Sequence, residues 1–305
     1  MKKTYIHRLG DDFRRNKVLY LMFLPVLAYY VLFCYKPMYG IIMAFTDYKV
    51  IDGYWGSDWV GLKNFIDYFE NPYFERTVRN TIVLNLMFLF FSFPMPICLA
   101  LLLNEVKNAV FKRTVQTVTY LPHFISTVVI CGMLSSFSLS SGLFNDIIAF
   151  FGGERSSLLS DPEFYRPLYV ISGMWREMGW NSIIYLAALS GVDAQLYEAA
   201  KIDGAGKWKQ TLHVTLPGIL PTIVIKLILQ IGGLMSLGNE KALLLYNSAI
   251  YETADMISTY SYRMGLEQLD YSYGTAIDLF NAVINIFLVV MANKISKKVT
   301  DSSLW

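Results

Sequence analysis

Long apolar segments separated by polar loops constrain the fold of this chain more than any other feature of its sequence. A helix needs about 20 mostly apolar residues to cross a bilayer, and six segments approach that length. Backbone polar groups must be satisfied inside lipid, so such segments predict helices rather than irregular chain. The predicted spans are 18–35, 81–103, 117–137, 168–189, 219–237 and 273–292.

The six segments differ in how strongly they predict a span. A proline pair beginning at Pro94 predicts a kink in the second segment, while Arg176 and Glu177 interrupt the fourth. Lys226 and Asp278 do the same in the fifth and sixth. Only 16% of the 305 residues are charged, and the mean hydropathy is +0.39, whereas soluble domains are nearer a quarter charged. We therefore predict an all-α integral membrane protein with a single transmembrane domain over 1–305.

The distribution of Lys and Arg predicts the orientation of the chain. An even number of spans places both termini on one side, and basic residues are more numerous in the segments of that side. Because an excess of Lys and Arg marks cytoplasmic segments, both termini are predicted to be cytoplasmic. The first apolar segment is long and no small-residue cleavage site follows it, so we interpret it as a retained anchor rather than a signal peptide.

The predicted cytoplasmic loop between the fourth and fifth spans, residues 190–217, carries the most specific pattern in the chain. Good helix formers over Leu196–Lys201 predict a short helix, which Gly204 ends in a left-handed cap. The small residues Ala199 and Ala200 leave a flat face that another protein can approach closely. We therefore expect a cytoplasmic partner to dock on this loop.

The spacing within this loop resembles the signature of binding-protein-dependent ABC importer permeases. That signature reads Glu-Ala-Ala, three residues, Gly, nine residues, Ile, one residue and Leu-Pro, and Val214 stands at the Ile position here. The resemblance implies that the loop helix sits in a cleft of a cytoplasmic ATPase and carries its closure into the membrane. The residues predicted to couple to the ATPase are Glu198, Ala199, Ala200, Asp203, Gly204, Leu216 and Pro217.

Further segments resemble one carbohydrate-uptake branch of these permeases, the lipoprotein-associated oligosaccharide or aldouronate type. They include Tyr35–Gly40, Trp59–Phe65, Tyr120–Ser126 and the closing Ser303–Trp305. The resemblance implies a type I ABC importer permease with six transmembrane helices, which moves an oligosaccharide across the bacterial cytoplasmic membrane by alternating access. The implied partners are a second related permease, two cytoplasmic ATPase subunits that bind ATP and Mg, and an extracellular sugar-binding lipoprotein. No cofactor or metal is expected in this chain.

Polar side chains within the predicted spans are candidates for the cargo path. Charges at bilayer depth are costly and normally face protein or water, and helical residues four apart share a face. Sugars bind through amide and carboxylate hydrogen bonds and aromatic platforms. The alternative is that these side chains bond between helices, and we expect Lys226 to snorkel to the membrane surface and His123 to bond a helix end. The candidate path residues are Trp175, Glu177, Trp180, Asn181, Tyr185, Asp278, Asn281 and Asn285.

Other functional classes find less support in the sequence. A net charge of +2 argues against a nucleic-acid binder. Cys34, Cys98 and Cys131 all fall in apolar runs and show no metal or disulfide spacing. Neither a catalytic triad nor a Gly-rich nucleotide loop is present, so the ATPase must be another chain. The alternative function is an ion-coupled secondary transporter that uses intramembrane carboxylates, although such proteins usually show inverted repeats.

Overall fold

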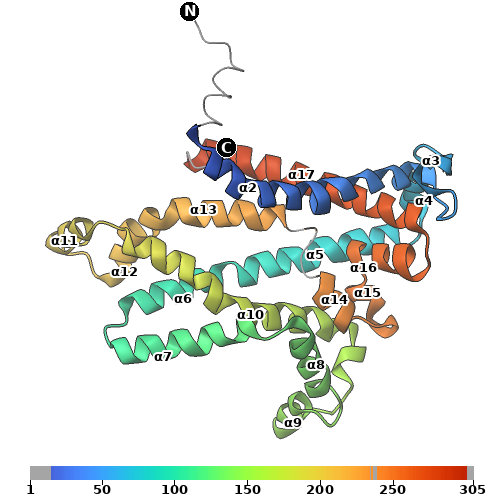
Figure 1. The fold of residues 1–305 in the computed structure, drawn as a ribbon. Helices are drawn as coiled ribbons and strands as arrows, with labels where there is room; N and C mark the ends of the chain where they lie inside the picture. Colours follow the sequence, from blue (N-terminus) through green and yellow to red (C-terminus); the bar gives the residue numbers. More distant parts are fainter. Residues whose placement is uncertain (1–14, 234, 236–238, 301–305) are drawn as a thin grey trace, which may run out of the picture.

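The computed structural model describes residues 15–233, 235 and 239–300, which form a bundle of long helices (Figure 1). Among these residues, four helical stretches are long and apolar enough to cross a membrane. They overlap the first, second, fifth and sixth predicted spans, and each begins before the predicted start. The stretches are Lys17–Phe45, Phe74–Glu105, Lys207–Gly232 and Tyr271–Lys298.

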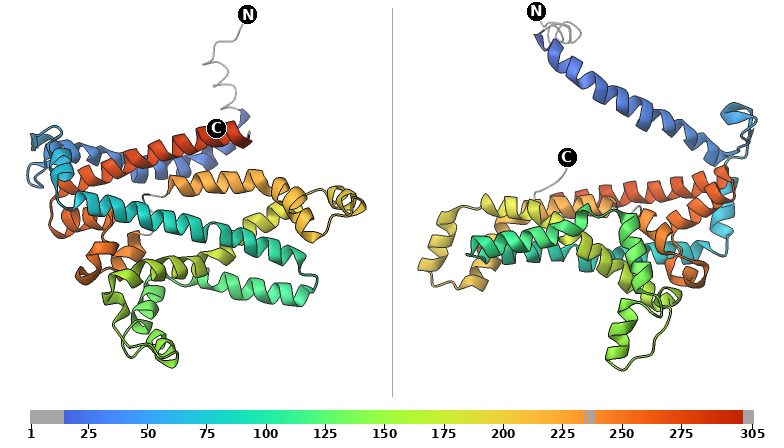
Figure 2. Two further views of the ribbon diagram at one scale, coloured as in Figure 1. Left: turned by 180° about the vertical axis from the view of Figure 1, so that it is seen from behind. Right: turned by 60° about the horizontal axis from the view of Figure 1, so that its bottom comes forward.

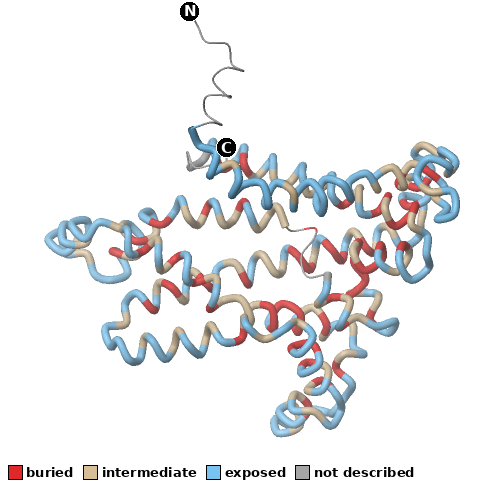
Figure 3. Tube along the Cα trace, viewed as in Figure 1, coloured by how far each residue is buried: buried red, intermediate tan, exposed pale blue. Residues whose placement is uncertain are grey.

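The first span is the least buried of the four apolar stretches. It begins as α2 (Lys17–Tyr29) and continues as π-helical and 3-10 segments over Tyr30–Tyr35 and Lys36–Phe45. None of its most apolar window is buried, and α2 leans away from the bundle (Figure 2). Most of α2 is exposed (Figure 3). Its exposed side chains are mostly large and apolar, as expected of a helix covered by lipid or by another subunit.

The second span is divided where the proline pair predicted a kink. Helix α5 (Phe74–Ser92) is followed by α6 (Pro94–Glu105), with Pro94 at the first position of α6. Proline is tolerated there because the first turn of a helix has no internal acceptor for its N–H.

The third predicted span, 117–137, differs most from the structure. Helix α7 (Ala109–Tyr120) runs into a 3-10 turn over Leu121–Phe124, and α8 (Thr127–Phe137) then leaves at 95°. Pro122 lies in that turn, Ile125 is extended, and the hydroxyl of Ser126 accepts a hydrogen bond from Val129 N at the start of α8. A proline followed by a serine cap starts a new helix instead of continuing the old one.

The fourth predicted span is the 29-residue helix α10 (Pro162–Ser190). It is long enough to cross a membrane, but Arg176, Glu177 and Asn181 make its centre too polar for it to count among the four apolar stretches. Polar groups are tolerated at that depth when protein covers them. Helix α10 packs on α5, α6, α7 and α13 (Leu216–Gly232), and buried residues gather along it (Figure 3).

The fifth and sixth spans lie side by side. Helix α13 ends at Gly232, short of the predicted limit at 237; residues 234 and 236–238 lie outside the described part. Helix α17 (Tyr271–Thr300) packs along α13 and against the Lys36–Phe45 segment. The sixth span therefore holds the first and fifth together.

Short elements close the two ends of the bundle. The end that holds the 190–217 loop also holds the α6–α7 turn, the start of α2 and the end of α17 (Figure 1), which is the grouping that the charge pattern predicted. Strands β1 (Thr46–Asp47) and β2 (Asp58–Trp59) pair antiparallel at the other end. The other short helices are α3 (Gly53–Gly56), α4 (Lys63–Glu70), α9 (Leu143–Phe150), α14 (Asn239–Leu245), α15 (Tyr251–Ala254) and α16 (Ile257–Tyr262).

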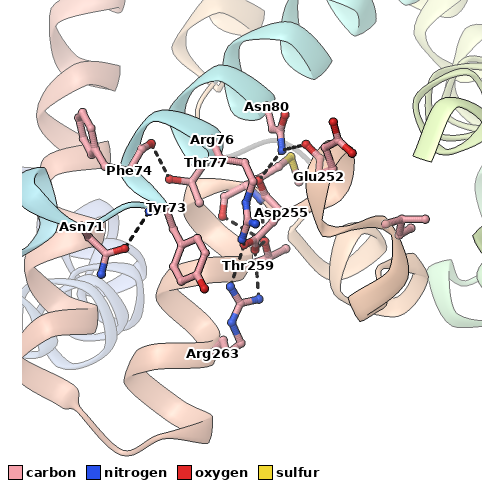
Figure 4. A network of polar contacts seen from close by, with 12 residues as sticks. Asn71, Tyr73, Phe74, Arg76, Thr77, Asn80, Glu252, Asp255, Thr259 and Arg263 are labelled. Atoms are coloured by element: carbon pink, nitrogen blue, oxygen red, sulfur yellow. Dashed lines mark hydrogen bonds and ion pairs between the residues drawn. The ribbon is translucent and has the colours of Figure 1, made fainter. Parts of the chain in front are cut away.

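A buried ionic network joins α5 to the α15–α16 connection (Figure 4). Asp255 has no exposed surface and pairs with Arg76 at 2.8 Å and with Arg263 at 2.8 Å. The hydroxyl of Thr259 donates to the same carboxylate at 3.0 Å. Asn80 donates to the carbonyl oxygens of Glu252 and Asp255. One carboxylate therefore fixes the geometry of this end of the bundle.

Candidate coupling surface and cargo path

The predicted coupling helix forms as α11 (Ala194–Ile202). The side chain of Asp193 caps its start by accepting a hydrogen bond from Gln195 N. Gly204 has φ of 72°, and the N–H groups of Gly204 and Ala205 donate to Lys201 O and Ala200 O. This pair of bonds is the Schellman arrangement, in which glycine is favoured because the left-handed conformation strains residues with a Cβ. The structure thus matches the predicted helix and its glycine end.

The surface of the coupling loop combines charge with exposed apolar groups. Glu198, Ala199 and Asp203 are exposed, and Ala200 is half-buried. Ile202 is 87% exposed, and Trp208 on α12 (Lys207–Gln210) is 73% exposed. An apolar patch with a charged rim is typical of a protein-binding surface rather than of a free loop.

Two contacts hold the coupling loop against the bundle. Lys207 pairs with Glu105 at the end of α6 at 2.7 Å, and the hydroxyl of Tyr197 donates to that of Thr215 at 3.0 Å. Leu216 and Pro217 begin α13, where Pro217 occupies the first turn. The motif therefore runs from an exposed helix, through a short connection, into a helix of the fifth span.

The largest group of charged side chains inside the bundle lines a cavity of about 310 Å³ between α5, α8, α10 and α14. Arg176 donates to the hydroxyl of Thr127 at 3.1 Å, and its Nε lies 3.6 Å from Glu177 Oε1. Lys241 donates to Tyr169 O at 2.6 Å and to Ser172 Oγ at 2.9 Å. Further wall residues include Phe88, Ile130, Gly173 and Glu240.

Glu177 also joins α10 to the bend between α7 and α8. Its Oε2 lies 3.1 Å from Nδ1 of His123, whose ring stacks on Trp180 at 4.6 Å between centroids. The helices approach so closely here that a Cβ at Gly179 would lie 2.0 Å from Thr119 O. The sequence predicts that His123 bonds a helix end. In the structure His123 instead contacts Glu177, a candidate path residue.

A second cavity, of about 130 Å³, continues along α10 toward the coupling end and shares Phe88 and Glu177 with the first. Asn181 and Tyr185 line it, and Tyr185 is 1% exposed. Lys226 of α13 lies in the same wall. The sequence instead predicts that this lysine snorkels to the membrane surface. The stripe Glu177, Asn181 and Tyr185 therefore faces protein-enclosed space, as a polar stripe inside a membrane should.

The other candidate residues lie apart from these cavities. Asn281 donates to Met235 O at 2.9 Å and Asn285 accepts from Met235 N at 3.0 Å, so both hold the chain beyond α13. Asp278 lines a separate cavity of about 360 Å³ between α16 and α17. Trp175 faces an apolar hollow of about 280 Å³ beside α8 and α9. The structure therefore favours a structural role for the two asparagines, which bond α17 to the segment that follows α13.

Lys241 is not among the candidate path residues predicted from the sequence. Residue 241 follows the fifth span, and hydropathy places it in an outer loop. In the structure α14 packs on α8 and lies beside α10, so its lysine enters the charged cavity. A lysine two residues from the start of a short helix carries no periodic signal, and only tertiary packing brings it to α10.

Comparison with known proteins agrees with this arrangement. Residues 75–301 match the family described as the binding-protein-dependent transport system inner membrane component. The chain is 47% identical, over 100% of its own length and 95% of the relative, to the polygalacturonan/rhamnogalacturonan transport system permease protein YteP of Bacillus subtilis.

Two solved structures share the fold. A chain of a bacterial ABC transporter that imports the acidic polysaccharide alginate matches with a TM-score of 0.89 and 41% identity, covering 96% of this chain and 99% of that one. A structure of the bacterial alginate transporter with a periplasmic protein bound to an alginate pentasaccharide matches equally well, with a TM-score of 0.89, 41% identity and coverage of 97% and 100%. The chain belongs to the family of binding-protein-dependent transport system inner membrane components, and it is an integral membrane permease of an ABC importer rather than an enzyme.

Proposed function

We propose that this permease imports an oligosaccharide and that α11 couples its movement to a cytoplasmic ATPase. The observation that carries the coupling role is the exposed helix with Glu198 on it, ended by Gly204 and continued into α13. Closure of the ATPase subunits on ATP would push α11, and α13 would transmit that push to α10. The cavities along α10 would then open alternately to the two sides of the membrane.

We infer the partners from the lack of a nucleotide-binding loop in this sequence and from the complex that a related transporter forms with a periplasmic protein. ATP and Mg would be bound by two separate ATPase subunits, because no nucleotide-binding loop occurs in the sequence. A second, related permease would enclose the other half of the path, and an extracellular binding lipoprotein would deliver the cargo. The alginate transporter in complex with a loaded periplasmic protein supports the last of these partners.

Relatives and path residues both support a saccharide cargo. YteP is named for transport of a pectic polymer, and the matching solved structures belong to an alginate importer. The cavities along α10 offer the amide of Asn181, the phenol of Tyr185 and the carboxylate of Glu177. Such groups exchange hydrogen bonds with sugar hydroxyls at little net cost.

The alternative of an ion-coupled secondary transporter gains no support from the carboxylates. Glu177 lies beside Arg176 and His123, and Asp278 lies in a different cavity, beside hydroxyl groups. The coupling loop would also have no role in such a transporter.

Uptake by the purified complex tests the proposed function. We expect vesicles that contain this chain, its partner permease and the ATPase subunits to accumulate labelled oligosaccharide only with ATP inside and loaded binding protein outside. Vanadate should stop the uptake, whereas collapse of ion gradients should not. Uptake driven by an ion gradient without ATP would contradict the proposal.

Orientation is tested by labelling of single cysteines in intact cells. The excess of basic residues near the coupling end predicts that this end is cytoplasmic. We therefore expect a cysteine at Asp58 to react with an impermeant maleimide and a cysteine at Lys207 to react only after permeabilisation. Asp58 and Lys207 are both exposed. A difference in their labelling would therefore report the side of the membrane and not burial. The reverse pattern would place the coupling loop outside.

A further inference from the structure

Asp278 is an exposed carboxylate within the sixth span. Helix α17 begins at Tyr271, so Asp278 lies about 10 Å along its axis from the end of the bundle opposite the coupling loop. The hydroxyl of Ser261 lies beside the carboxylate but donates to Gly274 O at 3.0 Å. A carboxylate at that depth would face hydrocarbon unless a polar group from outside this chain covers it.

The cavity that Asp278 lines, of about 360 Å³, carries a negative charge that this chain does not balance. Its described lining contains no lysine, arginine or histidine. Arg263 lies close in the sequence, but its guanidinium is held by Asp255 at 2.8 Å (Figure 4). Two further acids, Glu267 and Asp270, are exposed in the adjoining turn between α16 and α17. The cavity is therefore suited to a cation and unsuited to a purely anionic ligand.

Hydroxyl groups line the same cavity beside the carboxylate. Those of Ser258, Tyr262 and Tyr271 form no hydrogen bond with another described residue, whereas the hydroxyl of Thr275 donates to Tyr271 O at 2.7 Å. Each hydroxyl has one O–H to donate. The lining thus offers acceptor oxygens for an ammonium group and three donors for an anionic oxygen of the same ligand.

Apolar side chains complete the wall of this cavity. Met43 of the first span and Leu243 of α14 line it, and Leu266 beside them is 57% exposed. Tyr262 is 40% exposed, and tyrosine is enriched at the level where acyl chains meet headgroups. A polar cavity with apolar walls at this level fits a ligand that has a polar head and apolar tails.

We propose that this cavity binds the headgroup of a phospholipid that carries a primary amine, with the ammonium on Asp278 and the phosphate on the free hydroxyls. A primary ammonium forms a charge-assisted hydrogen bond with a carboxylate. Phosphatidylglycerol brings a phosphate without a cation and is repelled by Asp278. Phosphatidylcholine has a cation but no N–H donor. The site therefore selects phosphatidylethanolamine over both lipids.

Titration of the delipidated complex with lipid tests this selectivity by native mass spectrometry. The complete complex is titrated with phosphatidylethanolamine, phosphatidylcholine and phosphatidylglycerol that have the same acyl chains. We expect one site per complex to bind the ethanolamine lipid about tenfold more tightly than the other two. Equal affinity of this site for the three lipids, or a preference for phosphatidylglycerol, would overturn the inference. This measurement needs no substitution, so it decides even where a variant does not assemble.

Replacement of Asp278 locates the site. We expect Asp278→Asn to abolish the preference for the ethanolamine lipid, whereas Asp278→Glu keeps the carboxylate and should retain most of it. Asp58→Asn is the matched control, because it removes an exposed carboxylate from β2 at the same end of the bundle. The same preference in Asp278→Asn as in the wild type would contradict the assignment.

Thermal unfolding separates a lipid from a cation supplied by the second permease. Phosphatidylethanolamine should raise the unfolding temperature of the wild-type complex more than phosphatidylcholine does, and this difference should vanish in Asp278→Asn. If the second permease supplies the cation, Asp278→Asn should instead lower the yield of the permease pair in every lipid, which would overturn the proposal. Sugar uptake enters neither measurement, so the proposed function is tested independently.

Discussion

Replacing Glu198 with Lys is expected to abolish ATP-driven uptake while leaving the permease inserted and folded. The side chain is exposed on α11 and forms no described ion pair, so its loss removes no contact inside the chain. In the proposed complex it meets basic groups of the ATPase, and charge reversal there costs several kcal/mol. The ATPase should therefore no longer co-purify, and uptake should fall to the level seen without ATP.

A matched charge reversal at the other end of the bundle controls for the change in net charge. Glu70 is likewise exposed, at the end of α4, and Glu70→Lys carries the same alteration. We expect the ATPase to co-purify with this variant in the normal ratio. Normal uptake by Glu198→Lys, or equal loss of ATPase from both variants, would show that α11 is not the coupling element.

Local sequence rules predicted the coupling loop well because its structure depends on neighbours in the chain. The helix predicted over Leu196–Lys201 and its glycine end at Gly204 are decided by residues within one or two helical turns. The division at Pro94 has the same local cause. No tertiary contact was needed to place these features, and the structure has them where the sequence predicts them.

The path could be predicted only in part because distant contacts decide it. The apolar pattern of 117–137 is continuous, and the 95° bend depends on Pro122, on Ser126 and on the close approach of Gly179 to Thr119. The spacing of Asn281 and Asn285 is that of a path stripe, yet both bond the backbone of Met235. Periodicity identifies the face of a helix but not what lies opposite that face.

The polar network at the other end of the bundle gives the second large expected effect. Replacing Asp255 with Ala leaves Arg76 and Arg263, whose side chains are 25% and 13% exposed, without the carboxylate that bridges them. Removal of one partner from a buried pair costs about 3–5 kcal/mol, and this carboxylate also accepts from Thr259. We expect a large fall in the unfolding temperature of the detergent-solubilised protein and a low yield of monodisperse complex.

The exposed pair of Asp146 and Arg155 provides the control for Asp255→Ala. The two residues approach to 2.7 Å, but their side chains are 55% and 45% exposed. Water replaces the lost partner there, so Asp146→Ala should cost less than about 1 kcal/mol. Equal unfolding temperatures for the two variants would mean that backbone hydrogen bonds from α5 and apolar packing hold the α15–α16 connection without the carboxylate. A fall confined to Asp255→Ala would identify its carboxylate as a group that fixes this end of the bundle to α5, since Arg76 reaches it from that helix.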